Sequence, residues 1–448
     1  MNSLTQYINL YKEHSAIINA NAPEALNRRR EAALAVLEQL PRLPERGDEG
    51  FEKVSLNDMF ATDYGVNIAR MKFDADTSAI SGCDVPNAGS LVAVVINDRF
   101  EAGDDLNRTL PEGVEVMSLA RAAELYPEDF AHNIAPETNP IVALNTLLVQ
   151  DGVYIRVRRG VNLEKPIQIL SIFNTSQPLL AARLVRIMVE DGAHATVLTC
   201  DHPRVEGIDY LACRVIETSI GKGASMNFYE LEEATTQCHR ASVFACEQNR
   251  DSSLNVVTIA LNGGIRRNEF YTRHIGENCT TSLNGMVIAT GEQVVDNSTF
   301  VLHDKCHCNS QQLFKYAMFD NAQGAFEGLV TVAENAFFTD AHQTNRNLLA
   351  SPSAQMHTMP QLIINCDEVK ASHGATTGQL DEKAMFYMRS RGIPEDEARM
   401  MLINAFMADV LEQISHEPLR ELLRHLVDRR LRGCSTVCSN CSIESLKR

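Results

Sequence analysis

The sequence predicts a mainly β protein with helical segments at both ends. From Asp151 onward, short β-branched runs follow one another, with turn residues between them and no convincing helix. Corners that contain glycine recur among these runs, and apolar residues return to a helical spacing at both ends of the chain. Without crossover helices the strands cannot form a doubly wound sheet, which leaves a sandwich, a barrel, a propeller or a solenoid.

Residues 1–140 are expected to form an N-terminal helical and α+β region. Apolar residues up to Leu40 recur at roughly helical spacing, and Pro41 ends that pattern. The rest of this region is mixed. Two elements stand out in it, a buried strand over residues 91–96 and a helix over residues 119–125.

The central block, residues 141–378, contains a recurring corner. Residues 190–193 read Glu-Asp-Gly-Ala, residues 221–224 read Gly-Lys-Gly-Ala, and residues 276–279 give a looser third copy, Gly-Glu-Asn-Cys. A stacked coil needs a small residue wherever the chain turns tightly under its neighbour, and each rung buries its face only against the next. The recurrence favours a β-helix, although the uneven spacing leaves a sandwich open.

Helices return over residues 379–432. Asp381 can cap one helix, Gly392 ends it, and Pro394 begins the next. The second helix carries one apolar stripe, formed by Ala398, Met401, Leu402, Ala405, Phe406 and Val410. Such a stripe packs on the β block or docks another chain. Residues 433–448 form a cysteine-rich tail.

Charge and hydropathy exclude two classes of partner. The 448 residues hold 41 Lys and Arg against 58 Asp and Glu, a net charge of −17, which disfavours binding to nucleic acid or to anionic membranes. The longest nearly uncharged apolar stretch, around residues 139–149, is shorter than the ~20 residues of a membrane span. The first residues lack a secretory pattern, so we expect a cytoplasmic protein with reduced thiols. Its twelve cysteines are therefore candidates for metal, cluster or sulfur chemistry, or are buried structural thiols.

His373 follows the last predicted strand, between small residues, where its near-neutral pKa range suits a metal ligand or proton carrier. An ordinary surface histidine is the alternative. Cys366 lies seven positions earlier. An uninterrupted strand would place the two on opposite faces, so a shared site needs a bulge or a turn between them.

Two further groups of cysteines have a metal-binding composition. Cys306 and Cys308 lie among the histidines of residues 303–308, and strand alternation would place both thiols on one face, as ligands or as core-facing thiols. Near the end of the chain three more thiols have the spacing Cys-x3-Cys-x2-Cys, namely Cys434, Cys438 and Cys441. That spacing is typical of radical S-adenosylmethionine enzymes, but no barrel follows it here. The tail either holds a cluster or zinc, or carries free thiols.

The sequence holds no phosphate-cradling loop, no nucleophile elbow and no His-Glu-x-x-His helix, which points away from an enzyme. Several long motifs instead resemble the SufB/SufD family of the SUF iron–sulfur cluster assembly system. They lie at residues 160–167, 310–315, 340–351, 360–362, 367–376 and 385–398. The sequence Ser-His-Gly-Ala-Thr around His373, in place of the Ser-His-Glu-Ala-Thr typical of the SufB branch, resembles the SufD branch.

The resemblance implies a right-handed parallel β-helix between an N-terminal α(+β) and a C-terminal helical segment. It also implies a non-catalytic scaffold subunit that pairs with a SufB-like subunit and binds a SufC-type ATPase, or forms a homodimer when isolated. The ATPase would contact Ala398, Met401, Leu402, Ala405 and Phe406. A transient iron–sulfur cluster would form at the subunit interface, supported by His373 and a thiolate of the partner, with no cofactor bound stably by this chain alone.

Two departures limit the carry-over of these roles. Ala371 stands where members of the SufD branch often have cysteine directly before Ser-His, and Cys366 is the candidate to replace that thiol. The cysteine-rich tail is not part of the family pattern. The alternative function is therefore an enzyme or metal-binding protein that uses the tail to hold a cluster or zinc; a secreted β-helical structural protein is a third option, which the thiol count disfavours.

Overall fold

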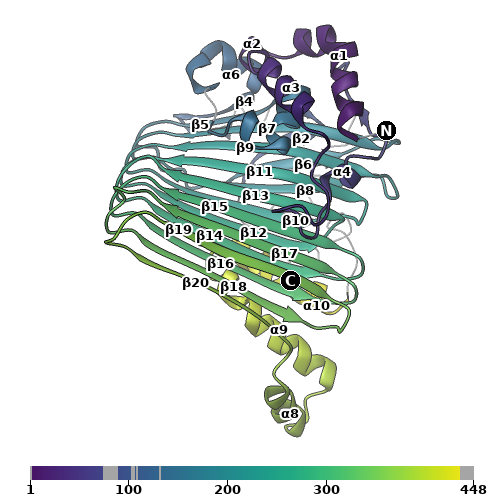
Figure 1. Ribbon diagram of the computed structural model, residues 1–448, viewed down its shortest axis with the longest axis vertical. Helices are drawn as coiled ribbons and strands as arrows, with labels where there is room; N and C mark the ends of the chain where they lie inside the picture. The colour runs from purple at the N-terminus through teal and green to yellow at the C-terminus, as the bar shows by residue number, and fades with distance from the viewer. Residues whose placement is uncertain (1–2, 74–88, 102–105, 107–108, 131–132, 434–448) are drawn as a thin grey trace.

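A flattened parallel β-solenoid of about eight turns forms the body of the protein (Figure 1). The computed structural model describes residues 3–73, 89–101, 106, 109–130 and 133–433. From Gly152 to Gly378, successive strands alternate between two ten-stranded sheets, and each strand before the last two pairs in parallel with the strand two places further along the chain. The predicted β-helix is thereby confirmed, and the sandwich is excluded.

The two sheets, here called sheet 1 and sheet 2, take the strands in strict order. Sheet 1 consists of β4 (Val114–Ser118), β5 (Gly152–Val157), β7 (Leu179–Val189), β9 (Tyr210–Ile220), β11 (Cys238–Gln248), β13 (Ile265–His274), β15 (Val294–His303), β17 (Gln323–Val332) and β19 (Gln355–Ile364), with β1 (Gly65–Val66) beside β7. Sheet 2 consists of β3 (Arg99–Glu101), β2 (Leu91–Ile96), β6 (Ile167–Phe173), β8 (His194–Pro203), β10 (Ser225–Glu233), β12 (Ser253–Asn262), β14 (Thr280–Ala289), β16 (Asn309–Met318), β18 (Asp340–Leu349) and β20 (Lys370–Gly378). Among the described residues, antiparallel pairs occur only at the start, between β2 and β3 and between β4 and β5. Thr280, Asn309, Asp340 and Lys370 hold the same place in consecutive turns, so one turn takes about 30 residues.

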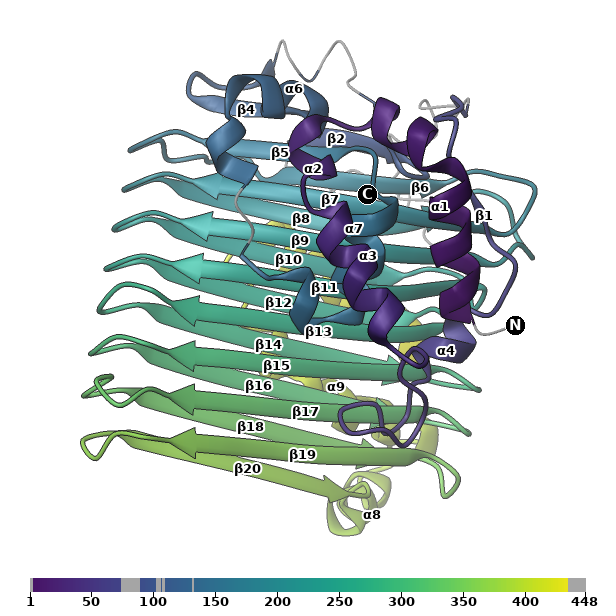
Figure 2. The ribbon, with the colours of Figure 1, turned by 45° about the horizontal axis from the view of Figure 1, so that its top comes forward.

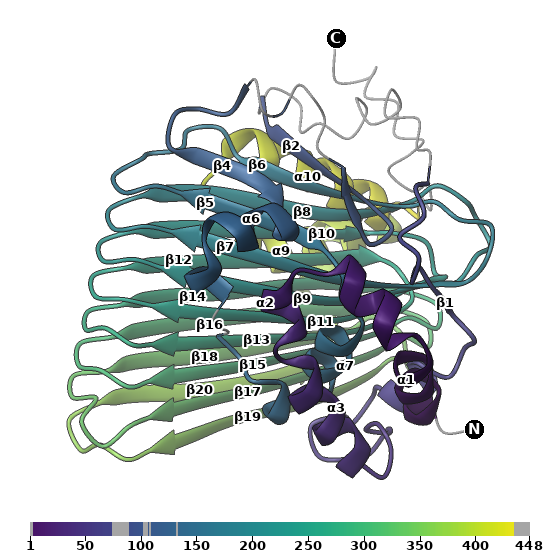
Figure 3. The same cartoon turned by 90° about the horizontal axis from the view of Figure 1, so that it is seen from above.

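Helices cover the outer faces of both sheets (Figure 2). The described helices are α1 (Ser3–Asn21), α2 (Glu24–Asn27), α3 (Arg30–Gln39), α4 (Leu56–Met59), α6 (Leu119–Leu125), η2 (Pro127–Phe130), η3 (Pro136–Thr138), α7 (Pro140–Leu148), α8 (Glu382–Ser390), α9 (Glu395–Leu411) and α10 (Glu417–Leu431), of which α8 lies away from both sheets. The N-terminal helices pack on sheet 1 and the helices α9 and α10 pack on sheet 2, so the two groups lie on opposite sides of the solenoid (Figure 3). No helix among the described residues is long and apolar enough to cross a membrane.

Several local predictions are confirmed by these elements. The strand over residues 91–96 is β2, and the helix over residues 119–125 is α6. Asp381 caps α8 by accepting hydrogen bonds from the next turn, and Gly392 follows that helix with a positive φ of 85°. The apolar stretch at residues 139–149 forms the buried helix α7, capped by Asn139.

The recurring corners are tight turns in the left-handed backbone conformation. Gly192 and Gly223 have φ of 68° and 64°, and in the looser third copy Asn278 takes the same role with φ of 57°. Each of these residues donates its backbone N–H to a carbonyl of the next corner, Asn278 for example to Cys306 at 3.1 Å. This column of hydrogen bonds explains why a small residue, or one that tolerates a positive φ, recurs at each turn.

Candidate functional site

The solenoid ends in two strands that lack a neighbour on one side. β19 is the last strand of sheet 1 and β20 the last strand of sheet 2, with ten and nine residues. Almost all of their side chains are exposed or half-buried, in contrast to the strands before them. Among the described residues nothing pairs with the outer edges of these strands. Long unpaired edges of this kind are templates for pairing with another chain.

His373 lies midway along β20, on the inner side of this open end. The register pairs it with Gln343 of β18, a buried residue that points into the solenoid between two half-buried outward-facing neighbours. Because equivalent residues of parallel neighbours share a face, the His373 ring points inward too. It stays exposed since no further turn covers it, and none of the described residues makes a hydrogen bond to it.

The interior beneath His373 is polar. Gln343 donates to Gln312 at 3.2 Å, and Thr299 donates to the same Gln312 oxygen at 2.6 Å. Gly328 leaves room for this group, because a Cβ there would lie 1.7 Å from the Gln343 amide nitrogen. The Gln343 Oε1 atom is buried without a protein partner. The mouth of the solenoid thus offers hydrogen-bonding groups next to an imidazole.

Cys366 lies at the corner between β19 and β20, where it is buried against the inner apolar core. The corner supplies the turn that a site shared with His373 requires. The two side chains nevertheless differ in access, since Cys366 is covered and His373 is open. Their joint role stays a prediction.

The C-terminal helices divide the predicted apolar stripe into two faces. Val410 is buried in the apolar cluster that packs on sheet 2, whereas Ala398 is fully buried but does not belong to that cluster. Met401 and Ala405 are exposed, whereas Leu402 and Phe406 are half-buried. A partner that binds α9 therefore has access to Met401 and Ala405, whereas Ala398 is covered.

Helix α8 stands away from the solenoid beyond β20 (Figure 1). None of its residues is buried, and it exposes two aromatic side chains, Phe386 at 75% and Tyr387 at 59%. The sequence analysis does not identify these two residues as contact residues, because an amphipathic pattern alone does not tell whether the apolar side of a helix packs on its own chain or on a partner.

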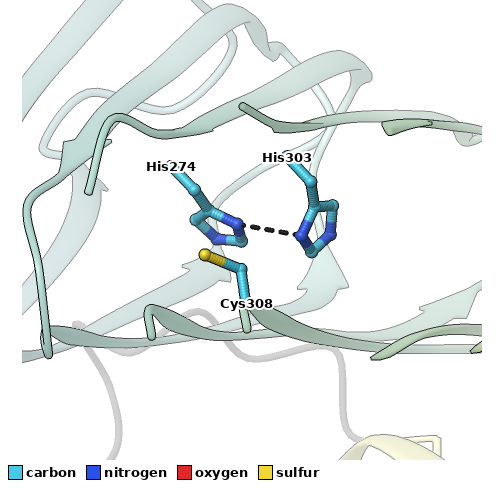
Figure 4. Close-up of side chains that lie close together, drawn as sticks. All are labelled: His274, His303 and Cys308. Atoms are coloured by element: carbon cyan, nitrogen blue, oxygen red, sulfur yellow. Dashed lines mark hydrogen bonds between the residues drawn. The ribbon is translucent and has the colours of Figure 1, made fainter. Parts of the chain in front are cut away.

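A second cluster of chemically active side chains lies inside the solenoid (Figure 4). His274, His303 and Cys308 are fully buried, and each offers one ligand atom within 4.8 Å of the other two. Cys306 is not among them, because residues 304–308 form a corner, and its thiol donates instead to the carbonyl of Asn335 at 3.1 Å. The strand alternation expected for Cys306 and Cys308 does not apply at this corner.

Burial sets the protonation of this cluster. It lowers the pKa of His303 to about 4 and that of His274 well below its usual range, so both imidazoles are neutral at physiological pH. A hydrogen bond from Cys308 to Cys279 lowers the pKa of the Cys279 thiol and raises that of Cys308, so the thiolate forms first on Cys279. Neutral imidazoles and thiolates are the forms that bind metals. The sequence does contain a signal for this cluster: the pattern His-x4-Cys occurs at residues 274–279 and again at residues 303–308.

Cys434, Cys438 and Cys441 lie outside the described residues, so their predicted metal or cluster site stays a prediction.

Comparisons with known proteins relate most of the chain to iron–sulfur cluster assembly. Residues 172–406 match the family model of the SufBD core domain of the SUF system, and residues 1–169 match that of the SufBD N-terminal region. An iron–sulfur cluster assembly SufBD family protein of Synechocystis is 28% identical over 431 residues, which cover 93% of this chain and 94% of the relative. The assembly protein SufD of Escherichia coli is 31% identical over 65% of this chain and 69% of its own length, and SufD of Bacillus subtilis is 25% identical over 66% and 68%.

Proposed function

This chain belongs to the SufBD family of the SUF iron–sulfur cluster assembly system, and from that membership we propose that it is a non-catalytic scaffold subunit. In this role it pairs with a SufB-like subunit through the open end of the solenoid and binds a SufC-type ATPase through its C-terminal helices. The nascent cluster is the cargo of the complex. The observation that carries the proposal is an exposed imidazole, His373, beside two unpaired strand edges.

The open end supports the pairing. β19 and β20 present backbone N–H and C=O groups along their outer edges, and natural proteins rarely leave strands of this length uncovered. Exposed Ile363 and Ile364 end β19 at the same rim. A second solenoid end laid against these edges would complete the hydrogen bonding and cover the apolar side chains.

The position of His373 suits cluster assembly at that seam. Imidazole and thiolate are both iron ligands, so one ring from this chain and one thiol from the partner would hold iron between them. A site at a seam is closed when the subunits meet and opens when they part. The polar groups of Gln343 and Gln312 line the inner side of this seam.

The C-terminal helices suit the ATPase. α9 is anchored on sheet 2 through Ile403, Met407 and Val410, so force applied to the exposed side of the helix reaches the solenoid directly. α8 offers Phe386 and Tyr387 without any covering element. Exposed aromatic residues are enriched where partners bind.

Co-expression with a SufB-like subunit and a SufC-type ATPase tests the proposal. We expect the three chains to purify as one complex under anaerobic conditions, and His373→Ala to lower its iron and sulfide content several-fold without lowering its yield. His342→Ala is the matched control, since His342 lies on β18 but faces outward, bonded to Ser372 and Asp340. A chain that stays monomeric with both partners present, or equal iron and sulfide in the two variants, would contradict the proposal.

A further inference from the structure

Two adjacent turns of the solenoid place two histidines and two cysteines at the same corner. His274 ends β13 and His303 ends β15, and the two residues are paired in register. Cys279 and Cys308 directly precede β14 and β16, whose first residues are also paired. Each of the two turns therefore contributes one imidazole and one thiol to one small volume inside the protein, where all four side chains are fully buried.

This set is confined to those two turns. One turn earlier the position of His274 is taken by Gln248, and one turn later the position of His303 is taken by Val332. The corresponding corner positions carry Ser252 and Thr339 in place of cysteine. The neighbouring turns show that glutamine, valine, serine and threonine are enough to fill the space at this corner. Packing alone therefore does not explain the repeated His-x4-Cys pattern.

The geometry of the imidazoles matches a tetrahedral metal site. The two Nδ1 atoms face each other at 3.1 Å, close to the ~3.3 Å that separates two nitrogens bound to one zinc ion at about 2.0 Å each. Sulfur–nitrogen separations in such a site are somewhat longer, about 3.6 Å. The Cys308 thiol lies within 4.8 Å of both rings and turns about a single side-chain torsion, so a shift of about 1 Å brings it into place.

The opposite nitrogens of the two rings are held by hydroxyl groups. His274 Nε2 lies 2.7 Å from the Thr281 oxygen, and His303 Nε2 lies 2.9 Å from the Ser310 oxygen. A metal-binding histidine almost always donates its other N–H to such a partner, which fixes the ring and its tautomer. Both rings are therefore oriented for binding through Nδ1.

The net charge of the buried site determines how many thiolates bind the ion. A divalent ion with one thiolate would leave a net positive charge in the interior, which is costly there. Two thiolates balance the charge, and Cys279 lies next to Cys308 as its hydrogen-bond acceptor. Its sulfur now points to the carbonyls of Asn249 and Gly276, at 3.1 and 3.2 Å, and turning it toward the rings frees both carbonyls, one on the half-buried Asn249 and one on the buried Gly276.

We propose that this corner of the solenoid binds one divalent transition-metal ion, Zn²⁺ or Fe²⁺, through His274, His303 and Cys308, with Cys279 as the fourth ligand. Binding releases the two thiol protons. The proton that one Nδ1 atom donates to the other before the ion binds moves to the Nε2 atom of its own ring, where a hydroxyl oxygen accepts it, so both rings stay neutral. The site lies apart from His373 and does not depend on the proposed assembly role.

The test uses the full chain with Cys434, Cys438 and Cys441 changed to serine, so that the tail cannot bind metal. Protein is purified from zinc-supplemented medium and, separately, anaerobically from iron-supplemented medium, and its metal content is measured by mass spectrometry. We expect about one ion per chain, and for Cys308→Ser and for His274→Gln/His303→Gln a loss of affinity greater than about tenfold. Cys306→Ser, two residues from Cys308 but outside the cluster, should bind as the parent does.

Reconstitution of the same parent chain with Co²⁺ gives a readout that needs no ligand variant. Tetrahedral cobalt with two thiolates should show intense visible bands and sulfur-to-metal charge transfer, weakened in Cys279→Ser. Absence of both bound metal and these bands in the folded parent chain would overturn the proposal, as would full metal retention after loss of Cys308. Spectra identical in the parent chain and Cys279→Ser would overturn the fourth ligand.

Discussion

The ring of Phe338 stacks on the ring of His307, with centroids 4.9 Å apart, and both residues hold the left-handed backbone conformation. They occupy equivalent corners of consecutive turns, where the earlier turns have Gly192 and Gly223. Phe338 donates its N–H to the carbonyl of Glu368, which continues the column of hydrogen bonds to the last corner. A phenylalanine with φ of 59° is strained, and its ring is 56% exposed.

The stabilities of two variants of Phe338 distinguish the backbone strain from the contribution of the ring contact. Both Phe338→Gly and Phe338→Ala remove the ring, but only glycine adopts φ of 59° without penalty. A residue other than glycine loses about 1–2 kcal/mol of stability in the left-handed conformation. Glycine avoids this strain but loses about 0.5–1 kcal/mol more through its larger backbone entropy in the unfolded chain. We therefore expect the glycine variant to be more stable than the alanine variant by about 0.5–1 kcal/mol in urea unfolding. Greater stability of the alanine variant would mean that this corner is not strained.

The inner packing of the solenoid depends on Gly285 of β14. A Cβ at this position would lie 2.2 Å from the ring of Phe314, which is fully buried and packs at 4.7 Å from Phe326. Because the ring has no room to move, we expect Gly285→Ala to lower the free energy of unfolding by about 1–3 kcal/mol. Gly374→Ala on β20 is the control, since nothing lies within 4 Å of its added methyl group. Equal denaturation midpoints for the two variants would contradict this account.

Glu327 should make the protein less stable as the pH rises. Burial, assisted by the nearby Asp296 carboxylate, raises the pKa of Glu327 to about 7, and one of its carboxyl oxygens is buried without a protein partner. The folded state therefore holds a proton that the unfolded state releases near pH 4.5. The resulting destabilisation is absent below pH 4.5, grows between 4.5 and 7, and is complete above 7.

Glu327→Gln removes this titration while keeping the shape of the side chain. Since the group is only half-buried, we expect a gain of about 1–2 kcal/mol at pH 8 and almost none at pH 4.5. Urea unfolding at both pH values checks this, with Glu334→Gln as an exposed control. A gain of the same size at both pH values would show that the carboxylate charge is not its cause.

Sequence patterns predict the elements that have a continuous apolar run or a capping residue at their start. The apolar run of β2 and the capped helix α8 are of this kind. Strands such as β11 and β13 have no such pattern, because some of their inward positions carry arginines that break apolar alternation. Arg240 of β11, for example, is fully buried and pairs with Asp201 at 2.6 Å and with Glu230 at 2.8 Å, both on other strands. Only the stacking of turns brings such partners together, so no local pattern reports them.

The candidate sites differ in the same way, because one is predicted by a local motif and the other depends on how the turns stack. His373 was found through the motif around it, and its exposure agrees with the expectation that it stands clear of neighbours. The cluster of His274, His303 and Cys308 needed the length of one turn, because its members are 29 and 34 residues apart in the chain. The sequence pattern groups Cys308 with His303 but not with His274, and it includes Cys306 only on the assumption of a strand where the structure has a corner.

The two proposed partner surfaces should respond to separate substitutions. Ile364 ends β19 at the open mouth and Phe386 projects from α8, and both side chains are exposed. A charge on a sheet edge opposes pairing with another edge. We expect Ile364→Lys to weaken binding of a SufB-like subunit, and dimerisation of the isolated chain, by about tenfold or more, equivalent to about 1.4 kcal/mol. Binding of a SufC-type ATPase should be unchanged.

Phe386→Lys should have the reverse effect, because it removes an aromatic anchor from α8 and leaves the strand edges intact. Analytical ultracentrifugation of the isolated chain and titration with each partner measure the four affinities. Both side chains are exposed, so neither variant disturbs the buried core, and circular dichroism should be the same for both. If one substitution weakened the binding of both partners equally, the open end and the C-terminal helices would form a single binding surface. The proposal of two separate partner surfaces would then be wrong.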